Sequence, residues 1–264
     1  MNTKPFLSRP SGRTMLIARV ADGLWHALEN DLVVGRGHAV RRPDGRLFVS
    51  IDAWHGTAFD RLAEAMLAAL PAPLYTVVDE ADVELASGWQ RVGFTVRRRE
   101  WEFGVPTDPR VTGLEAVLPP PGVTIVPVGE ADEGPLRALD RAIREEVGAG
   151  AGWHSMPAEV RPRPEGDTIV DPSRYAVAAA PDRYLGLVRL VTATRHPRIG
   201  LIAVRAGEHR RGIARALLAH VLGTLGHGGI ATASAEVDES NEAALALFEG
   251  IGSRRMSSSL ELAR

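Results

Sequence analysis

One short segment near residue 200 constrains the fold of this chain more than any other. Residues 199–204 are all apolar or glycine, a polar turn follows, and residues 213–225 repeat leucines at helical spacing. A buried strand joined by a short loop to an amphipathic helix is a building unit of mixed α/β folds. Gly207 and Gly212 lie in the loop, where glycine gives the backbone conformational freedom. The segment therefore predicts a strand, a tight loop and a helix within an α/β protein.

The remaining hydrophobic patterns supply strands and helices in the same order twice. We expect strands at 33–41, 47–52, 74–78 and 95–105 with helices at 57–70 and 81–91, then strands at 123–128, 175–180, 184–194, 199–204, 230–237 and 256–262 with helices at 130–147, 213–225 and 241–250. The spacing from Trp89 to Gly93 recurs from Phe248 to Gly252. These patterns predict an α/β (α+β mixed sheet) fold with two tandem domains of one architecture. The alternative is two unrelated helices that both end at glycine.

Prolines divide the chain near its middle. Pro106, Pro109 and the run from Pro119 to Gly122 interrupt any continuing helix or central strand. We therefore expect an N-terminal domain over 1–105, a linker over 106–121 and a C-terminal domain over 122–264.

Composition excludes several functional classes. The net charge is −2, so no global field favours nucleic acid, and no apolar stretch resembles a signal peptide or a membrane span. The absence of cysteine removes thiol nucleophiles and thiolate metal sites. His26, His38 and His55 show no metal-ligand spacing with one another. We expect a cytoplasmic protein with no metal, no nucleic-acid partner and no membrane association.

The start of the helix at 213 has the features of an anion site. Backbone N–H groups at a helix N-terminus lack helical partners, and the helix dipole adds positive charge. Gly212 allows the main chain to approach a ligand, and Arg210, Arg211 and Arg215 supply full charges. Ala214 keeps the first turn small. The alternative is an ordinary loop with a solvated basic face.

The loop and a second segment together resemble the GNAT N-acetyltransferase family, of the tandem-domain type. The family's pyrophosphate loop has the form Gln/Arg-x-x-Gly-x-Gly/Ala, and residues 209–214 match it except at His209. The second segment is most similar to the ribosomal-protein alanine N-acetyltransferases, and it matches their pattern at Glu236, Val237, Ser240, Asn241, Ala246, Leu247 and Gly252. The resemblance is strong over 199–255, extends over 122–264, and is architectural over 13–105.

The resemblance implies a set of site residues. Acetyl-CoA is expected to bind at Ile202, Ala203, Val204, His209, Arg210, Arg211, Gly212, Ile213, Ala214, Arg215, Asn241 and Phe248. Glu236 occupies the position of the family's general base, although a charged residue on an exposed strand is the alternative. Phe248 replaces the tyrosine that protonates the leaving thiolate in these relatives. Residues 52–58 carry no arginine, so the first domain is expected to be degenerate, serving as scaffold or as one wall of the acceptor site.

The function implied is transfer of an acetyl group from acetyl-CoA (coenzyme A) to a primary amine by direct attack with general-base assistance. The acceptor is expected to be a small molecule or a peptide, and the protein a monomer or a homodimer. His154, in the long loop 148–172, is a further candidate for the acceptor pocket, or simply a surface histidine. The alternative function is a non-catalytic acyl-CoA-binding sensor or interaction module, which Phe248 favours.

Overall fold

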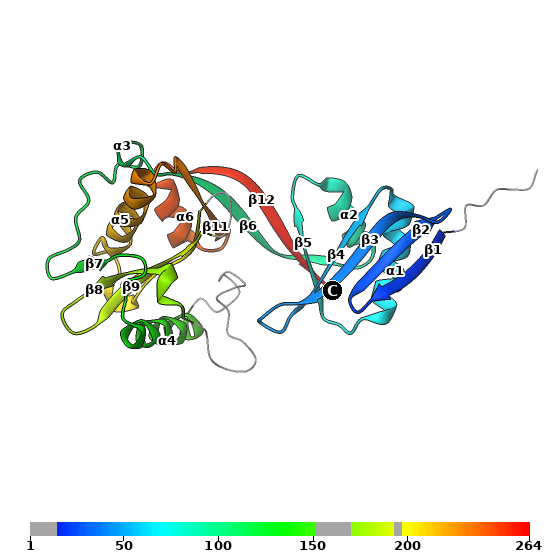
Figure 1. Ribbon diagram of the computed structural model, residues 1–264, viewed down its shortest axis with the longest axis horizontal. Helices are drawn as coiled ribbons and strands as arrows, with labels where there is room; N and C mark the ends of the chain where they lie inside the picture. The colour runs from blue at the N-terminus through cyan, green and yellow to red at the C-terminus, as the bar shows by residue number, and fades with distance from the viewer. Residues whose placement is uncertain (1–14, 151–169, 193–196) are drawn as a thin grey trace, which may run out of the picture.

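The computed structural model describes residues 15–150, 170–192 and 197–264. Its strands form one 12-stranded mixed sheet in the order β1-β2-β3-β4-β5-β12-β6-β11-β10-β9-β8-β7. The molecule has two lobes joined by the long strands β6 and β12, as Figure 1 shows. The expected α/β class with a mixed sheet is confirmed.

The N-terminal half consists of strands and of two helices that pack together on one face of those strands. Its elements are β1 Met15–Ala21, β2 Leu24–Glu29, β3 Leu32–Arg41, β4 Leu47–Ala53, α1 Gly56–Ala69, β5 Leu74–Asp79, α2 Val83–Arg91 and β6 Thr95–Pro106. The helix α1 begins at Gly56 instead of at residue 57, and His55 is its N-cap. The core under α1 and α2 holds Leu62 and Trp89, both almost fully buried.

The C-terminal half repeats the same order of strands and helices, with one helix inserted within the repeat and another short helix before it. Its elements are α3 Pro109–Thr112, β7 Thr124–Val126, α4 Glu133–Ala149, β8 Tyr175–Ala179, β9 Tyr184–Val191, β10 Arg198–Val204, α5 Ile213–His227, β11 Thr232–Asp238, α6 Glu242–Glu249 and β12 Arg254–Ala263, with short 3-10 turns at 172–174 and 206–208. The segment 106–121 includes α3 and the buried Leu114, which packs into the core of this half.

Strand pairing shows that the two halves share one topology. In the first half, β1 to β4 pair antiparallel in chain order and β4 then pairs parallel with β5. In the second half, β7 to β10 pair antiparallel in chain order and β10 then pairs parallel with β11. The helix α4 follows β7, whereas β1 and β2 are joined by a short turn. The internal repeat is therefore a property of the fold, and α4 is the addition in the second copy.

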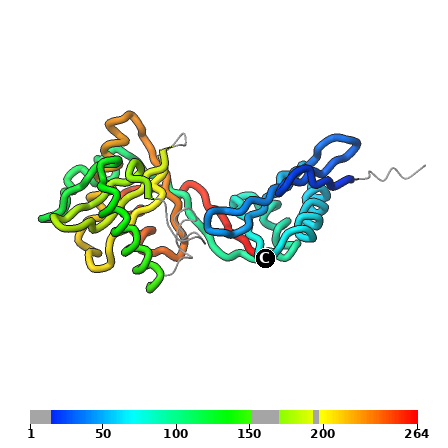
Figure 2. Tube along the Cα trace, turned by 60° about the horizontal axis from the view of Figure 1, so that its bottom comes forward, coloured from blue at the N-terminus to red at the C-terminus, as the bar shows by residue number. Residues whose placement is uncertain are grey.

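The last strand of each half is inserted into the other half. β12 lies between β5 and β6 and pairs antiparallel with both, while β6 lies between β12 and β11 in the same way. Leu260 and Leu262 of β12 join the core of the N-terminal half, and Phe103 and Val105 of β6 join the core of the C-terminal half. In Figure 2 the C-terminal strand crosses from one lobe to the other. The domain boundaries expected at 105 and 122 stay a prediction, and two strands cross between the halves they define.

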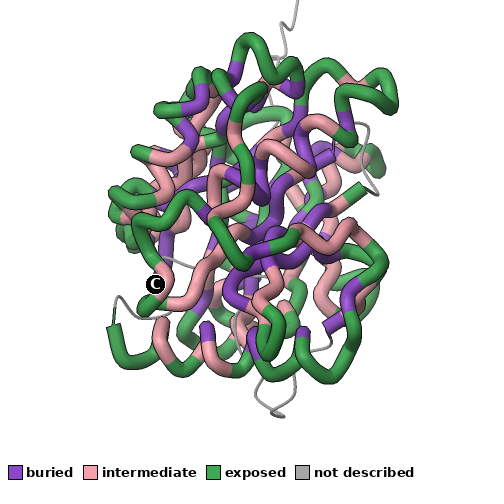
Figure 3. The backbone as a smooth tube through the Cα atoms, turned by 90° about the vertical axis from the view of Figure 1, so that its left-hand side faces the viewer, coloured by how far each residue is buried: buried purple, intermediate pink, exposed green. Residues whose placement is uncertain are grey.

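Helices cover the sheet unevenly. α5 and α6 pack with Phe103, Ala235 and Phe248 on one face of the second half, whereas α4 packs on the other face over β8, β9 and β10. Figure 3, which looks along the molecule from this half, shows buried residues gathered in its interior. Within the described ranges, no helix combines the length and apolar character needed to cross a membrane. On the face of the sheet that carries α4, the strands β6 and β11 present charged side chains instead of apolar core residues.

Candidate active site

The loop before α5 presents an open helix start. Gly212 is the N-cap of α5 with φ of 86°, and no side chain hydrogen-bonds to cap the helix. A Cβ placed on Gly212 would meet no atom within 4 Å. Arg210 also has a positive φ, 62°, so the chain turns sharply just before the helix. Among the described residues, the start of α5 therefore has no capping side chain, which leaves its first N–H groups available to an anion such as phosphate.

The arginines of this loop differ in their contacts. Arg210 is exposed and has no ion pair within the described residues. Arg211 is paired with Glu208, which also contacts Arg183 at 3.3 Å. Arg215 lies in the first turn and donates to the Gly250 carbonyl at 3.5 Å. Among the described residues, Arg210 and Arg215 thus have no anionic partner, whereas Arg211 is held in place by Glu208.

The start of the loop is anchored to the strand and to α4. The His209 Nε2 lies 2.8 Å from the Val204 carbonyl oxygen, and since a carbonyl only accepts, Nε2 carries the proton. Glu146 of α4 accepts from Arg205 Nε at 2.6 Å and from the Ala206 N–H at 2.8 Å. Burial opposes ionisation of Glu146, but these hydrogen bonds outweigh it and lower its pKa. The first part of the loop is therefore held by hydrogen bonds to β10 and to α4.

The strands β10 and β11 part beside this loop. They pair only at Arg198–Ser234 and Ile199–Ala235 within the described residues, although both strands continue beyond. Residues 201–204 pair with β9 on their other side, so one main-chain edge of this stretch has no strand partner. Ile202, Ala203 and Val204 are half-buried at this edge. The arrangement gives an extended ligand a strand edge that leads to the open helix start.

The corresponding place in the N-terminal half is closed. β4 and β5 pair only at Leu47–Leu74 and Phe48–Tyr75, so the parting of the strands recurs. At the start of α1, however, His55 Nδ1 accepts from the Ala58 N–H at 3.3 Å. At α1 a side chain thus accepts a hydrogen bond from one of the first N–H groups of the helix, whereas the corresponding N–H groups of α5 have no side-chain cap in the described segments.

Glu236 lies on β11 at the strand end that parts from β10. Its side chain is 46% exposed, and its Oε2 accepts from Arg198 at 3.1 Å. No hydrogen bond to its Oε1 occurs within the described part of the chain. Arg198 therefore holds one carboxylate oxygen, and the other has no hydrogen-bond partner among the described residues, which suits a group that takes a proton from a substrate.

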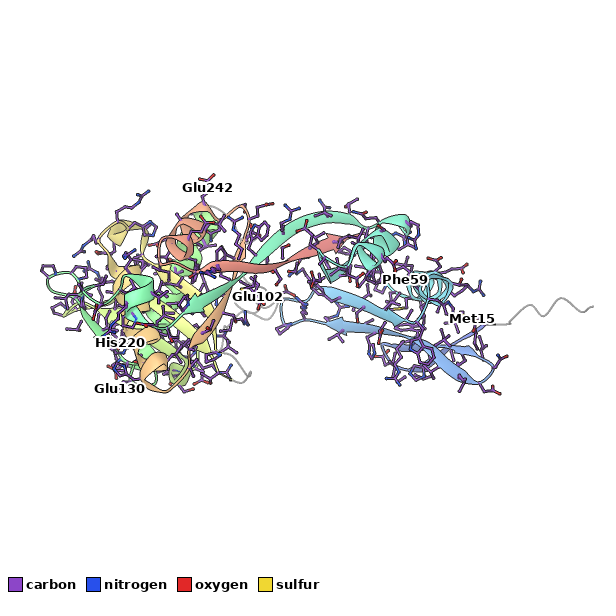
Figure 4. The ribbon with its side chains drawn as sticks, turned by 90° about the horizontal axis from the view of Figure 1, so that it is seen from above. Met15, Phe59, Glu102, Glu130, His220 and Glu242 are labelled. Carbon is purple, nitrogen blue, oxygen red and sulfur yellow. The ribbon has the colours of Figure 1, made fainter. Side chains whose placement is uncertain are left out.

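Further carboxylates of β6 lie beside Glu236 on the same face, and the sequence analysis did not single them out. Glu102 is directly opposite Glu236 in the β6–β11 ladder and accepts from Ser257 Oγ of β12 at 2.6 Å. Burial raises the pKa of Glu100, Arg98 opposes this shift, and the charge of Glu236 adds to it. Figure 4 shows Glu102 at the inner side of the C-terminal half, where the linking strands leave it. The alternation of Glu100, Trp101, Glu102 and Phe103 in the sequence was the available signal, since it marks one polar and one buried strand face.

The other predicted site residues have structural contacts. Asn241 is the N-cap of α6, and its Oδ1 accepts from the Ala244 N–H at 3.1 Å. Phe248 is 2% exposed and stacks on Phe103 with ring centroids 5.9 Å apart. Ile213 is also buried, while Ala214 is half-buried in the first turn of α5. Their roles toward a cofactor stay predictions. His154 lies outside the described residues.

Part of this chain matches a known protein family. Residues 142–252 match the family described as Acetyltransferase (GNAT) family. This range contains the open helix start and Glu236. The likeness to this family therefore covers this segment, less than half of the chain. No curated protein sequence matches the chain.

Solved structures extend the likeness to nearly the whole chain. A GCN5-related N-acetyltransferase from Sphaerobacter thermophilus is 17% identical with a TM-score of 0.64, and the match covers 94% of this chain and 82% of that one. A tandem GNAT protein from the clavulanic acid biosynthesis pathway is 14% identical with a TM-score of 0.64, covering 91% and 82%. A GCN5-related N-acetyltransferase from Kribbella flavida is 15% identical with a TM-score of 0.54, covering 95% and 89%. At these identities the likeness shows the fold alone.

Metal chemistry has no evident support in the described ranges. They contain no group of three or more histidine, aspartate or glutamate side chains that is able to hold a metal ion.

Proposed function

We propose that the C-terminal half is an N-acetyltransferase that moves an acetyl group from acetyl-CoA to a primary amine. The observation that supports this most is the uncapped start of α5 at Gly212, placed at the end of a strand edge that has no partner. A diphosphate suits the first feature, and an extended pantetheine arm suits the second. The GNAT assignment of residues 142–252 supports the same reading.

The residues of the loop fit the cofactor in specific ways. N–H groups at the start of α5 and the Arg210 guanidinium would hold the pyrophosphate, and Glu208 would keep Arg211 beside it. The main chain at Ala203 and Val204 would pair with the pantetheine arm. Bound acetyl-CoA supplies the acetyl group as an activated thioester.

Glu236 is proposed to act on the acceptor. Its Oε1 takes the proton from the attacking amine while Arg198 holds Oε2. The amine nitrogen forms a bond to the acetyl carbon, the carbon–sulfur bond breaks, and coenzyme A leaves as its thiolate. N–H groups along the free edge of β10 are suited to stabilise the negative charge on the carbonyl oxygen, a contribution of roughly 3–4 kcal/mol for one donor.

A Glu236→Gln variant tests the catalytic assignment. We expect kcat to fall by about 10²–10⁴ while the affinity for CoA stays unchanged, because the base does not contact the phosphates. Release of free thiol from acetyl-CoA in the presence of a panel of amines measures turnover. Glu249→Gln is a matched control, since Glu249 is 50% exposed and paired with Arg255 at 2.6 Å. Equal turnover in the Glu236 variant and the wild type would contradict the role of Glu236.

A second candidate function is an acyl-CoA-binding sensor without turnover. Phe248 favours it, because phenylalanine at this position offers no hydroxyl to protonate a leaving thiolate. CoA binding without turnover on any amine, in both the wild type and the Glu236→Gln variant, would support the sensor over the enzyme.

A further inference from the structure

A line of charged side chains runs across the sheet from the N-terminal half to Glu236. Arg46, at the β3–β4 hairpin, contacts Asp44 at 2.6 Å and Glu261 of β12 at 2.8 Å. Glu261 is directly opposite Arg98 of β6 in the ladder, so the two side chains share a face.

The line continues from β6 to β11. Arg98 contacts Glu100 and lies 2.8 Å from Asp238, which is directly opposite Glu100 in the β6–β11 ladder. Glu236 lies two residues before Asp238 on β11, so the two side chains share a face. The hairpin of the first half and the candidate base of the second half therefore border one continuous polar face.

Arg42 is the cation on this line without an anionic partner. Its guanidinium carbon lies 3.6 Å from the centroid of the Phe48 ring, and no ion pair or side-chain hydrogen bond of Arg42 occurs within the described ranges. Burial lowers the pKa of Arg42, and the neighbouring charge of Arg46 lowers it further. A half-buried guanidinium held over an aromatic ring, with no side-chain hydrogen bond among the described residues, is well placed to bind a carboxylate or a phosphate.

The carboxylates along this line act electrostatically on Arg42, and Glu261 and Asp44 do so more strongly than Glu100. The charge of Glu100 raises the pKa of Arg42, and the charge of Glu236 raises the pKa of Glu100. Glu100 thus lies within the electrostatic reach of both groups. An acceptor with its amine at Glu236 and an anionic group directed to the hairpin would meet opposite charges at both ends.

We propose that Arg42 binds an anionic group of the acceptor, so that the acceptor is an amine that also carries a carboxylate or a phosphate. This inference rests on the proposed acetyltransferase function. It assigns the N-terminal half a part in choosing the substrate, because Arg42 and Phe48 both belong to that half.

The test compares acceptors that differ only in the anionic group. ω-Amino carboxylates of increasing chain length are assayed beside their methyl esters, and aminoalkyl phosphates of the same lengths form a third arm. In the wild type we expect kcat/KM to favour an acid or a phosphate over the ester by roughly tenfold or more, the scale of a charge-assisted hydrogen bond. The better of the two anionic arms identifies the group.

Arg42→Gln should remove this preference through KM and leave turnover of the esters unchanged, and Arg42→Lys should restore part of it. Arg41→Gln is the matched control, because Arg41 is exposed and donates to Gly45 of its own hairpin. Esters accepted as well as acids by the wild type, or an equal loss for both in Arg42→Gln, would overturn the inference while leaving acetyl transfer intact.

A binding measurement tests the role of Arg42 independently of turnover. Calorimetric titration of the same acids and phosphates into CoA-saturated protein should show binding to the wild type and to Arg41→Gln, and a loss of tenfold or more in Arg42→Gln. Equal affinity in all three proteins contradicts the role of Arg42. Absence of turnover on every amine contradicts the proposed function instead.

Discussion

Gly212 and His55 occupy equivalent positions in the two halves, and their difference decides which helix start can hold an anion. Gly212 leaves the N-terminal N–H groups of α5 uncapped, whereas the His55 ring accepts from an N–H of α1. The spacing of Arg210, Arg211 and Gly212 was sufficient to predict this loop, because local sequence determines a helix start. The pairing of Glu208 with Arg183 of the β8–β9 hairpin depends on tertiary structure and was not predictable, whereas Arg211 and Glu208 are only three residues apart.

Gly212→Ala should separate the stability of this turn from its binding role. A φ of 86° is unfavourable for alanine by about 1–2 kcal/mol, so we expect a loss of this size in the free energy of unfolding. The new Cβ would project into the space where a phosphate is expected, so CoA affinity should fall by tenfold or more. Urea unfolding and calorimetry measure the two effects. Gly207→Ala in the same loop is the control, since Gly207 also has open space around it but no positive φ. Unchanged CoA affinity in Gly212→Ala would argue against phosphate binding at this turn.

At the scale of elements, α4 is the helix inserted within the second copy of the repeat, and Glu146 ties its end to the loop before α5. Hydrophobic spacing predicted α4, α5 and the strands around them to within a few residues. The strands β1 and β2 were not predicted, because Arg19, Asp22 and His26 interrupt their apolar pattern. The polar face of β6 was not predicted as part of the site, because its role depends on β11 lying beside it, and strand pairing is not visible in the sequence pattern.

Glu146→Gln should weaken this attachment in a pH-dependent way. The lowered pKa of Glu146 means that its stabilisation is present above the unfolded-state pKa of about 4 and disappears as the pH falls through the lower folded-state value. We expect a loss of about 1 kcal/mol in the free energy of unfolding at pH 7 and a smaller loss at pH 3, discounted because the pair is partly exposed. Urea unfolding at both pH values measures it, and Glu145→Gln, at an exposed neighbouring position, is the control. A pH-independent difference would exclude the proposed charge effect.

At the scale of the whole molecule, the exchange of β6 and β12 makes each half depend on the other. Sequence periodicity predicted both strands and the repeat, but it placed each strand in its own half. Which strand pairs with which is a long-range choice that local pattern does not determine. The arrangement also brings Glu102 and Ser257 from the two exchanged strands to the face beside Glu236.

Leu262→Ala tests this dependence. Leu262 is fully buried in the core of the N-terminal half although it lies near the end of the chain, so truncation should cost about 2–5 kcal/mol. Because β12 spans both halves, we expect one cooperative unfolding transition, with α5 losing hydrogen-exchange protection together with α1. Met256→Ala in the same strand, at a 69% exposed position, should have little effect. Loss of protection confined to the N-terminal half would show that the halves unfold independently.

Titration of CoA into the Arg210→Ala/Arg211→Ala variant tests the central claim most directly. The account predicts that CoA binds more weakly than to the wild type by roughly 1–3 kcal/mol, while pantetheine, which lacks the diphosphate, binds both proteins equally. Arg61→Ala, an exposed position on α1, should match the wild type for both ligands. Equal CoA affinity in the double variant and the wild type would contradict a diphosphate site at the start of α5.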